Sequence, residues 1–324
     1  MKNVFLIIFC TTIVLSSCNN DDEIMPAGIN YKQEMRDFVI GISKYSKSIS
    51  PGFIIVPQNG IELVTTTGEA DDRPHNDYLN AIDANGQEDL FYGYNSDNSP
   101  TPPTENLYLR KFLDISKNAG NAILVTDYCS TPAKMDDSFS KNQSNNYISF
   151  AANHRELNVI PDYPNPVFSE NNKQIKSISE VQNFLYLINP EKFSTKTEFI
   201  NAVTATNYDL LIMDLFFNDG TTFTNTEINQ LKKKKNGGSR LVISYMSIGE
   251  AEDYRYYWSN DKPDWLDREN PEWEGNFKVK YWNNDWQKII YGNDDSYLKK
   301  ILDAGFDGVY LDIIDAFEYY ESRR

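Results

Sequence analysis

Short runs of apolar residues alternate with segments of helical periodicity along most of the chain. Apolar runs of about four to seven residues predict buried strands, whereas apolar residues three and four positions apart predict helices. The predicted strands begin near residues 53, 79, 122, 157, 183, 208, 241 and 308. Strands that alternate with helices in this way favour parallel pairing and right-handed crossovers. The pattern therefore predicts an α/β fold, a single-domain (β/α)8 TIM barrel.

One helix is predicted before the first strand, over residues 35–49, and Pro51-Gly52 ends it. Little of the chain remains after the eighth strand. We therefore expect the N-terminal helix to take the place of the last helix of the barrel, with the two chain ends close together. The second strand is ambiguous. Aromatic residues favour residues 89–92, whereas residues 79–84 with a turn at Asn85-Gly86 are the alternative.

The first residues have the pattern of an export signal. Lys2 precedes an apolar stretch that is too short to span a bilayer. Leu15-Ser16-Ser17-Cys18 has the form of a lipobox, so residues 1–17 are predicted to be cleaved and Cys18 to be lipidated; an ordinary secretory signal is the alternative. The acidic tract that follows resembles that of surface-exposed bacterial lipoproteins. We expect a secreted lipoprotein of the outer membrane, on the cell surface, with residues 18–30 as a tether and 31–324 as the domain.

The charge balance narrows the choice of partners. The chain has 31 basic and 47 acidic residues and a net charge of −16, and loss of Lys2 with the signal would make it −17. Such a chain repels nucleic acid and anionic lipid. We therefore expect no nucleic-acid partner, membrane contact through the lipid anchor alone, and a neutral or cationic ligand.

Cysteine and histidine are scarce in the predicted domain. Cys129 is its only cysteine, which leaves no intrachain disulfide, and we interpret it as a packing residue rather than a nucleophile. His75 and His154 lie in polar surroundings, away from other potential ligands. Zinc sites and Ser-His triads need histidine close to other ligands or acids, so we expect neither chemistry, and no metal or cofactor.

Several predicted strands end in carboxylates. Catalytic groups of parallel α/β barrels sit at the carboxyl ends of the strands, so these residues predict one acidic pocket. An acidic pocket with few histidines points first to sugar chemistry. The strand-end residues are Asp127, Tyr128, Asp214, Glu250, Glu252, Asp312 and Asp315.

Residues 245–258 combine two glutamates with an arginine and several aromatic residues. Arg255 could hold Glu252 as a bidentate pair, which would lower the pKa of Glu252 and fix its rotamer; a surface salt bridge on a helix is the alternative. All five tryptophans lie between Trp258 and Trp286. They could stack on sugar rings or pack a long loop, and the two interpretations are compatible.

Four segments together resemble glycoside hydrolase family 114, the endo-α-1,4-polygalactosaminidase-type barrels. They read SYMSIGEAEDYR, WLDRENPEW, KVKYW and GFDGVYLDIIDAF, and the resemblance runs from about residue 208 to 320 in the expected order. Residues 51–60 and 81–92 resemble segments that follow the GFDGVYLD strand in most members. Here they precede it, so the resemblance implies a circularly permuted barrel, in agreement with the expected place of the N-terminal helix.

The resemblance also implies roles for individual residues. Asp312 matches the family's nucleophilic aspartate and Glu88 its acid/base glutamate, which favours a second strand over residues 79–84, just before Glu88. We expect neighbouring acids to raise the pKa of Glu88, and Asp312 to stay ionised if hydrogen bonds reach it. Tyr310 stands where fungal members carry a glutamate. The residues expected to line the pocket and bind hydroxyl or amino groups are Asn59, Asp127, Tyr128, Asp214, Glu250, Glu252 and Asp315.

The predicted function is therefore a glycoside hydrolase that cleaves an α-linked, galactosamine-type polysaccharide. A retaining mechanism with two carboxylates is expected, and a partly cationic polymer suits the acidic chain. The alternative is a glycan-binding surface lipoprotein whose acid pair is altered. A polysaccharide deacetylase is a third possibility, opposed by the lack of a histidine cluster.

Overall fold

The computed structural model describes residues 28–323. The predicted signal peptide and the lipidation site Cys18 lie outside the described residues, so these predictions rest on the sequence alone. Within the described part of the chain, no helix is both long and apolar enough to cross a membrane.

Eight parallel strands of the described chain form the centre of the fold, in two hydrogen-bonded sheets. The larger sheet has the order β1-β11-β7-β6-β5 and the smaller β2-β3-β4. In the larger sheet, Val309 of β11 lies opposite Ile55 of β1 and Ser244 of β7. The strands are β1 (Ile54–Pro57), β2 (Ala84–Glu88), β3 (Ala122–Tyr128), β4 (Ile148–Ala152), β5 (Phe184–Tyr186), β6 (Leu210–Asp214), β7 (Leu241–Ser247) and β11 (Gly308–Asp312).

The two sheets meet at both of their edges. Gln58, directly after β1, forms a parallel bridge with Gly86 of β2, and the Asn59 amide donates to the Gly86 carbonyl at 2.9 Å. At the other junction β4 and β5 are neighbours, with the rings of Phe150 and Phe184 5.6 Å apart. This α/β arrangement is consistent with a TIM-like barrel that backbone pairing does not close.

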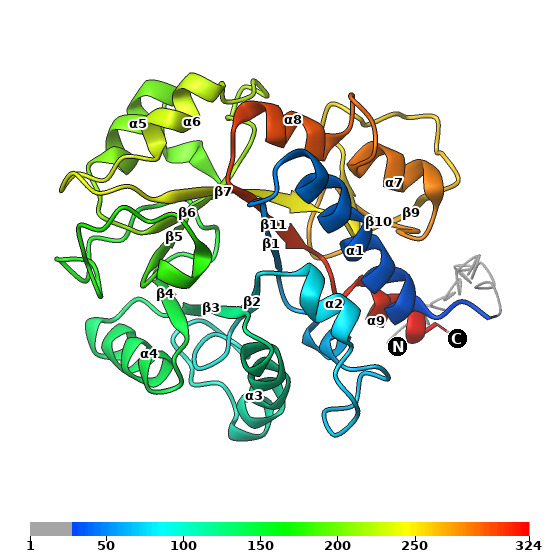
Figure 1. Ribbon diagram of the computed structural model, residues 1–324, viewed down its shortest axis with the longest axis horizontal. Helices are drawn as coiled ribbons and strands as arrows, with labels where there is room; N and C mark the ends of the chain where they lie inside the picture. The colour runs from blue at the N-terminus through cyan, green and yellow to red at the C-terminus, as the bar shows by residue number, and fades with distance from the viewer. Residues whose placement is uncertain (1–27, 324) are drawn as a thin grey trace, which may run out of the picture.

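Helices lie around the outside of the strands (Figure 1). Their starts follow from local capping: the Asn30 side chain accepts from the Gln33 amide, and Thr224 forms a capping box with Glu227. The helices are α1 (Tyr31–Ile49), α2 (Asn76–Ala81), α3 (Pro103–Asn118), α4 (Pro132–Ser144), α5 (Lys196–Thr204), α6 (Asn225–Leu231), α7 (Asn284–Ile290), α8 (Tyr297–Ala304) and α9 (Ala316–Glu321). Short 3₁₀ helices span Ile61–Val64, Ile178–Glu180 and Pro190–Lys192.

The N-terminal helix α1 packs beside the C-terminal helix α9, so the two ends of the described chain are close together. It packs against α2, α8 and α9, and α9 directly follows the last strand (Figure 1). Lys32 forms an ion pair with Glu321, and the rings of Tyr31 and Tyr320 are 5.5 Å apart. The described ends therefore lie side by side, as the sequence predicts.

The second strand lies later in the chain than the sequence predicts. Residues 79–81 belong to α2, and β2 begins at Ala84, so Asn85-Gly86 is inside a strand and is not a turn; residues 89–92 form no strand either. A Cβ atom on Gly86 would lie 2.0 Å from the Tyr310 hydroxyl oxygen. Glycine is required here because the Tyr310 side chain approaches the backbone closely.

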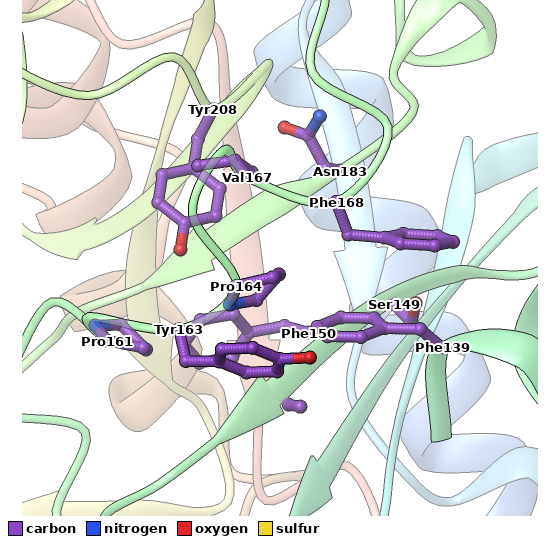
Figure 2. Close-up of a pocket in the computed structure, with 11 residues that line it drawn as sticks. Phe139, Ser149, Phe150, Pro161, Tyr163, Pro164, Val167, Phe168, Asn183 and Tyr208 are labelled. Atoms are coloured by element: carbon purple, nitrogen blue, oxygen red, sulfur yellow. The ribbon is translucent and has the colours of Figure 1, made fainter. Parts of the chain in front are cut away.

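The strand predicted at residues 157–160 is also wrong. The fourth strand is β4, directly after α4, and residues 157–160 lie in a loop. The chain that follows folds back over β4, where Phe139 of α4 and Phe168 stack with ring centroids 4.7 Å apart. Figure 2 shows these aromatic side chains together with Phe150, and they leave a space of only about 10 Å³.

Between β7 and α7 the chain adds an antiparallel sheet that the sequence does not predict. Its order is β8-β10-β9, with β8 at Glu250–Glu252, β9 at Leu266–Glu269 and β10 at Asn276–Val279. Most tryptophans pack within the segment between β7 and α7 or against it. The rings of Trp265 and Trp286 are 4.9 Å apart, and Trp286 donates to the Ile248 carbonyl at 2.8 Å. Trp273 differs, because 57% of it is exposed.

Candidate active site

A cavity of about 320 Å³ opens at the carboxyl ends of the central strands. Elements from the whole length of the described chain contribute to it, from the end of β1 to the loop after β11. All but one of the predicted pocket residues line this cavity. Those that do are Asn59, Glu88, Tyr128, Asp214, Glu250, Glu252, Asp312 and Asp315. The structure thus brings Glu88 and Asp312, at opposite ends of the sequence, into one cavity.

Asp127 is the exception. It is fully buried away from the cavity and accepts hydrogen bonds from the Phe91 amide at 2.7 Å, from Ser138 at 2.6 Å and from Asn142 at 3.1 Å. Adjacent residues of a strand point to opposite faces, so Tyr128 faces the cavity and Asp127 faces α4. Asp127 therefore fixes the loop after β2 and does not bind ligand from this position.

Glu88 is held at the end of β2 by two neighbours. Asn59 donates to its Oε2 atom at 3.1 Å, and the Tyr128 hydroxyl donates to its Oε1 atom. The guanidinium of Arg155 lies over the Tyr128 ring at 3.8 Å and also binds Asp89 at 3.0 Å. Both carboxylate oxygens are therefore oriented before any ligand arrives.

The backbone around these residues is strained. Asn59, Asp89 and Ile313 have positive φ angles of 59°, 56° and 57°. Ile313 is β-branched, for which this region is a clear outlier, and it directly follows Asp312. Strain of this kind persists where surrounding structure enforces it and gathers at functional sites.

Asp312 accepts a hydrogen bond from the Tyr245 hydroxyl at 2.6 Å. Burial nevertheless raises the pKa of Asp312 to about 7, and the charge of Glu88 adds to the rise while Tyr245 opposes it. The expectation that hydrogen bonding keeps Asp312 fully ionised is therefore not met: near pH 7 both protonation states are populated.

Asp315 belongs to the same group of acids. Burial raises the pKa of Asp315 to about 8, and the charges of Asp312 and Glu318 contribute. Its side chain is consequently mostly protonated at neutral pH in the free protein. A protonated carboxyl can donate a hydrogen bond, and a cation placed beside it would favour its ionised form.

Asp315→Asn is expected to stabilise the protein at alkaline pH. The folded-state pKa of about 8 exceeds an unfolded value of about 3.9, so the Asp315 contribution to stability is fully present below about pH 4 and is lost as pH rises through 8. Asparagine avoids the buried charge. We expect a gain in unfolding free energy of roughly 1–3 kcal/mol at pH 9, allowing for partial solvent screening.

Urea unfolding of wild type and Asp315→Asn at pH 4 and pH 9 measures this gain. Asp303→Asn is the matched control, because Asp303 is an exposed acid on α8. A gain of equal size at both pH values would contradict the assignment of the raised pKa to Asp315.

Arg255 connects two of the predicted acids. It donates to Glu252 at 2.5 and 3.2 Å and to Asp214 at 2.6 and 3.0 Å, and all three side chains are largely buried. The expected bidentate pair with Glu252 is confirmed, and the alternative of a surface salt bridge is wrong. Burial raises the pKa of Asp214, while Arg255 opposes this rise.

Glu250 also has a cationic partner. Lys278 donates to its Oε1 atom at 3.1 Å and Asn270 at 2.9 Å. The antiparallel sheet and its loop therefore tie Glu250 to the rim of the cavity. By contrast, no ion pair within the described chain joins Glu88, Asp312 or Asp315 to a lysine or arginine.

Sequence reasoning missed several functional neighbours. Tyr245 lies inside an apolar run, and its position near the end of a strand was the available signal. Arg155 and Lys278 reach the site from a loop and from β10, and no local pattern marks them.

The described residues include no group of three or more histidine, cysteine, aspartate or glutamate side chains placed to hold a metal ion. Cys129 is buried, and burial and then the Asp127 charge raise the pKa of its thiol to about 12. The thiol is therefore protonated, in agreement with a packing role.

Residues 167–323 match the family model of glycoside hydrolase family GH114. This part of the chain is a GH114 domain. It supplies Asp214, Arg255, Asp312 and Asp315 to the cavity, whereas Glu88 comes from the chain that precedes the matched GH114 segment.

Curated relatives are similar over part of the chain. An uncharacterized protein of Methanocaldococcus jannaschii is 42% identical over 171 residues, which cover 47% of each chain. An uncharacterized protein of Thermotoga maritima is 37% identical over 122 residues, which cover 36% of each chain. An uncharacterized protein of Deinococcus radiodurans is 38% identical over 128 residues, which cover 38% of this chain and 39% of the relative. The chain thus spans half or less of the length of these relatives.

Proposed function

We propose that this protein hydrolyses an α-linked, galactosamine-type polysaccharide, with Asp312 as nucleophile and Glu88 as acid/base. The GH114 match supports glycoside hydrolysis, and the observation that carries the residue assignment is the shared cavity. There the charge of Glu88 acts on Asp312 strongly enough to contribute to its raised pKa. Two carboxyl groups in one cavity are what glycoside hydrolysis requires.

The proposed reaction has two steps. Ionised Asp312 attacks the anomeric carbon while protonated Glu88 gives its proton to the departing glycosidic oxygen, which forms a glycosyl-enzyme ester. Glu88 then takes a proton from water, the water oxygen attacks the anomeric carbon, and Asp312 leaves. Tyr245 stabilises the Asp312 carboxylate, while Asn59 and Tyr128 hold Glu88 in position.

The charges of the cavity favour an amino sugar. Arg255 and Lys278 form ion pairs with Asp214, Glu252 and Glu250, whereas Glu88, Asp312 and Asp315 have no cationic partner in the described chain, and the charge of Glu88 helps to raise the pKa of the other two. An ammonium group bound beside them would relieve this repulsion and lower the pKa of Asp312. Substrate binding would thereby favour the ionised nucleophile.

The proposal includes the fold-level inference of a circularly permuted, TIM-like barrel. Support comes from α1, which packs between α8 and α2 and beside the short α9, where a final barrel helix would lie. Chain ends that lie together permit such a rearrangement without disturbing the core.

Incubation with an α-1,4-linked galactosamine polymer tests the function. We expect shorter oligosaccharides by mass spectrometry, and NMR of the first products gives the anomeric outcome. The double variant Glu88→Gln/Asp312→Asn is the control. Binding of the polymer without any new reducing end would replace this proposal with a glycan-binding protein.

The pH dependence of kcat/KM should report Asp312. Because the nucleophile must be ionised, activity is expected to rise with pH through about 7. Tyr245→Phe removes the hydrogen bond that favours the ionised form, so this acidic limb should move to higher pH by roughly one unit. Tyr94→Phe, on an exposed tyrosine outside the cavity, is the control. An unmoved limb in Tyr245→Phe would exclude Asp312 as the group observed.

A further inference from the structure

A second cavity, of about 450 Å³, adjoins the first. The two cavities share Asp214 and Arg255, together with Asn189 and Tyr254. The buried ion pair of Asp214 with Arg255 therefore forms a common wall between them. No step of the proposed reaction uses the second cavity.

Four aromatic residues line the second cavity, namely Phe216, Phe217, Tyr254 and Tyr256. Tyr256 is 46% exposed, yet its ring is held edge-on by Tyr257 and Tyr297 at centroid distances of 5.4 and 6.1 Å. Phe216 lies 6.0 Å from Tyr256, and the Arg255 guanidinium lies over Phe216 at 5.3 Å. The Lys300 ammonium lies over the Tyr256 ring at 4.8 Å and the edge contacts fix its orientation, so the exposed part of the ring is a rigid surface, which costs little side-chain entropy on binding.

The polar groups of this cavity are amides. Asn189 donates to the Glu156 carbonyl, and Asn218 donates to the carbonyls of Pro190 and Phe193. These contacts settle which end of each amide is the nitrogen. The two Oδ1 atoms receive no hydrogen bond within the described chain, so they remain acceptors for a hydroxyl or an acetamido N–H group.

The charges of the two cavities differ. Asp214 and Arg255 are the charged residues among those that line the second cavity, and they form an ion pair that Arg255 shares with Glu252. The first cavity holds three acids without cationic partners in the described chain. A cationic sugar therefore gains more binding free energy in the first cavity, whereas an uncharged sugar ring can enter the second cavity without burying a charge.

We propose that the second cavity is a distal subsite that binds an uncharged, N-acetylated sugar unit of the same polymer, stacked on Tyr256. This inference rests on the proposed function, because it takes the first cavity as the place of cleavage. It implies that the preferred substrate is a partly acetylated chain, with a free amine at the cleavage site and an acetylated unit beyond Asp214 and Arg255.

Calorimetric titration with two α-1,4-linked oligosaccharides tests the subsite: a galactosamine trisaccharide with free amines, and a hexasaccharide in which the same trisaccharide is extended by three N-acetylgalactosamine units. Tyr256→Ala is expected to weaken binding of the hexasaccharide by about tenfold and to leave that of the trisaccharide unchanged. Tyr256→Phe keeps the ring and should bind as wild type does. Tyr94→Ala removes a tyrosine of similar exposure, 49%, outside both cavities and serves as the control.

Equal losses for both oligosaccharides, or no loss for the hexasaccharide, would overturn the subsite. Asn218→Ala, on an exposed residue, gives a second test if Tyr256→Ala unfolds, and it should show the same dependence on chain length. Turnover separates the two proposals. A wild type that cleaves no amino-sugar polymer refutes the proposed function, while a length-dependent loss of binding in Tyr256→Ala still supports the subsite.

Discussion

Asp312→Asn and Glu88→Gln are each expected to lower kcat on an α-linked galactosamine polymer by about 10²–10⁴-fold. Asparagine at position 312 cannot form the glycosyl ester, and glutamine at 88 cannot transfer a proton. The two losses should differ in kind. With an aryl glycoside, whose leaving group needs no proton, Glu88→Gln should recover most of the first step, whereas Asp312→Asn should stay inactive.

Glu105→Gln is the matched control for this pair, because Glu105 lies at the start of α3, outside both cavities. Thermal unfolding of each variant shows whether the fold persists. Full turnover in both Asp312→Asn and Glu88→Gln would remove the assignment, and recovery of Asp312→Asn by the aryl substrate would reverse the two roles.

Arg255→Met should give the largest loss of stability, about 3–5 kcal/mol. Arg255 is 6% exposed and neutralises both Glu252 and Asp214 through charge-assisted hydrogen bonds. Methionine replaces its volume but leaves two carboxylates buried without a cation. Unfolding in urea at pH 7, read by tryptophan fluorescence, measures the difference.

Arg268→Met is the control for this prediction, since Arg268 is exposed and lies 3.9 Å from Asp267; such surface pairs contribute about 0–1 kcal/mol. The variant Arg255→Met/Glu252→Gln/Asp214→Asn removes the stranded charges and should regain part of the stability. A triple variant no more stable than Arg255→Met would show that packing, and not charge, explains the loss.

The strand-end acids could be predicted because their signal is local. Asp214 and Asp312 each follow a buried apolar run directly, and parallel strands bring such ends to one edge. The prediction that Asp127 lines the cavity is wrong because adjacent strand residues point to opposite faces, and its neighbour Tyr128 faces the cavity. An apolar run marks where a strand ends, but it does not decide which of two adjacent end residues faces inward.

The two misplaced strands have different causes. The local sequence predicts a turn at Gly86, yet Gly86 lies inside β2 and makes room for Tyr310. Tyr310 is 224 positions later, so no local pattern indicates this contact. For β4 a local signal existed: Asn146 adopts a left-handed conformation, φ 56°, which ends α4 before residue 147 and leaves the apolar residues that follow for a strand.

The partners of the acids depended on contacts far apart in sequence. Tyr245 meets Asp312 because β7 and β11 are paired in register, and Asn59 meets Glu88 because β1 lies beside β2. These contacts also determine the pKa of Asp312. Sequence alone therefore located the acids, but it did not predict the rise in the pKa of Asp312, which burial and the charge of Glu88 cause.

The first described turn of α1 contacts α9, the helix that begins one residue after Asp315 of the cavity. The polypeptide therefore enters the folded body on the same side as the cavity opening. A lipid attached upstream would turn this opening toward the surface that holds the lipid. Long polymers would then approach sideways, through the layer between that surface and the protein.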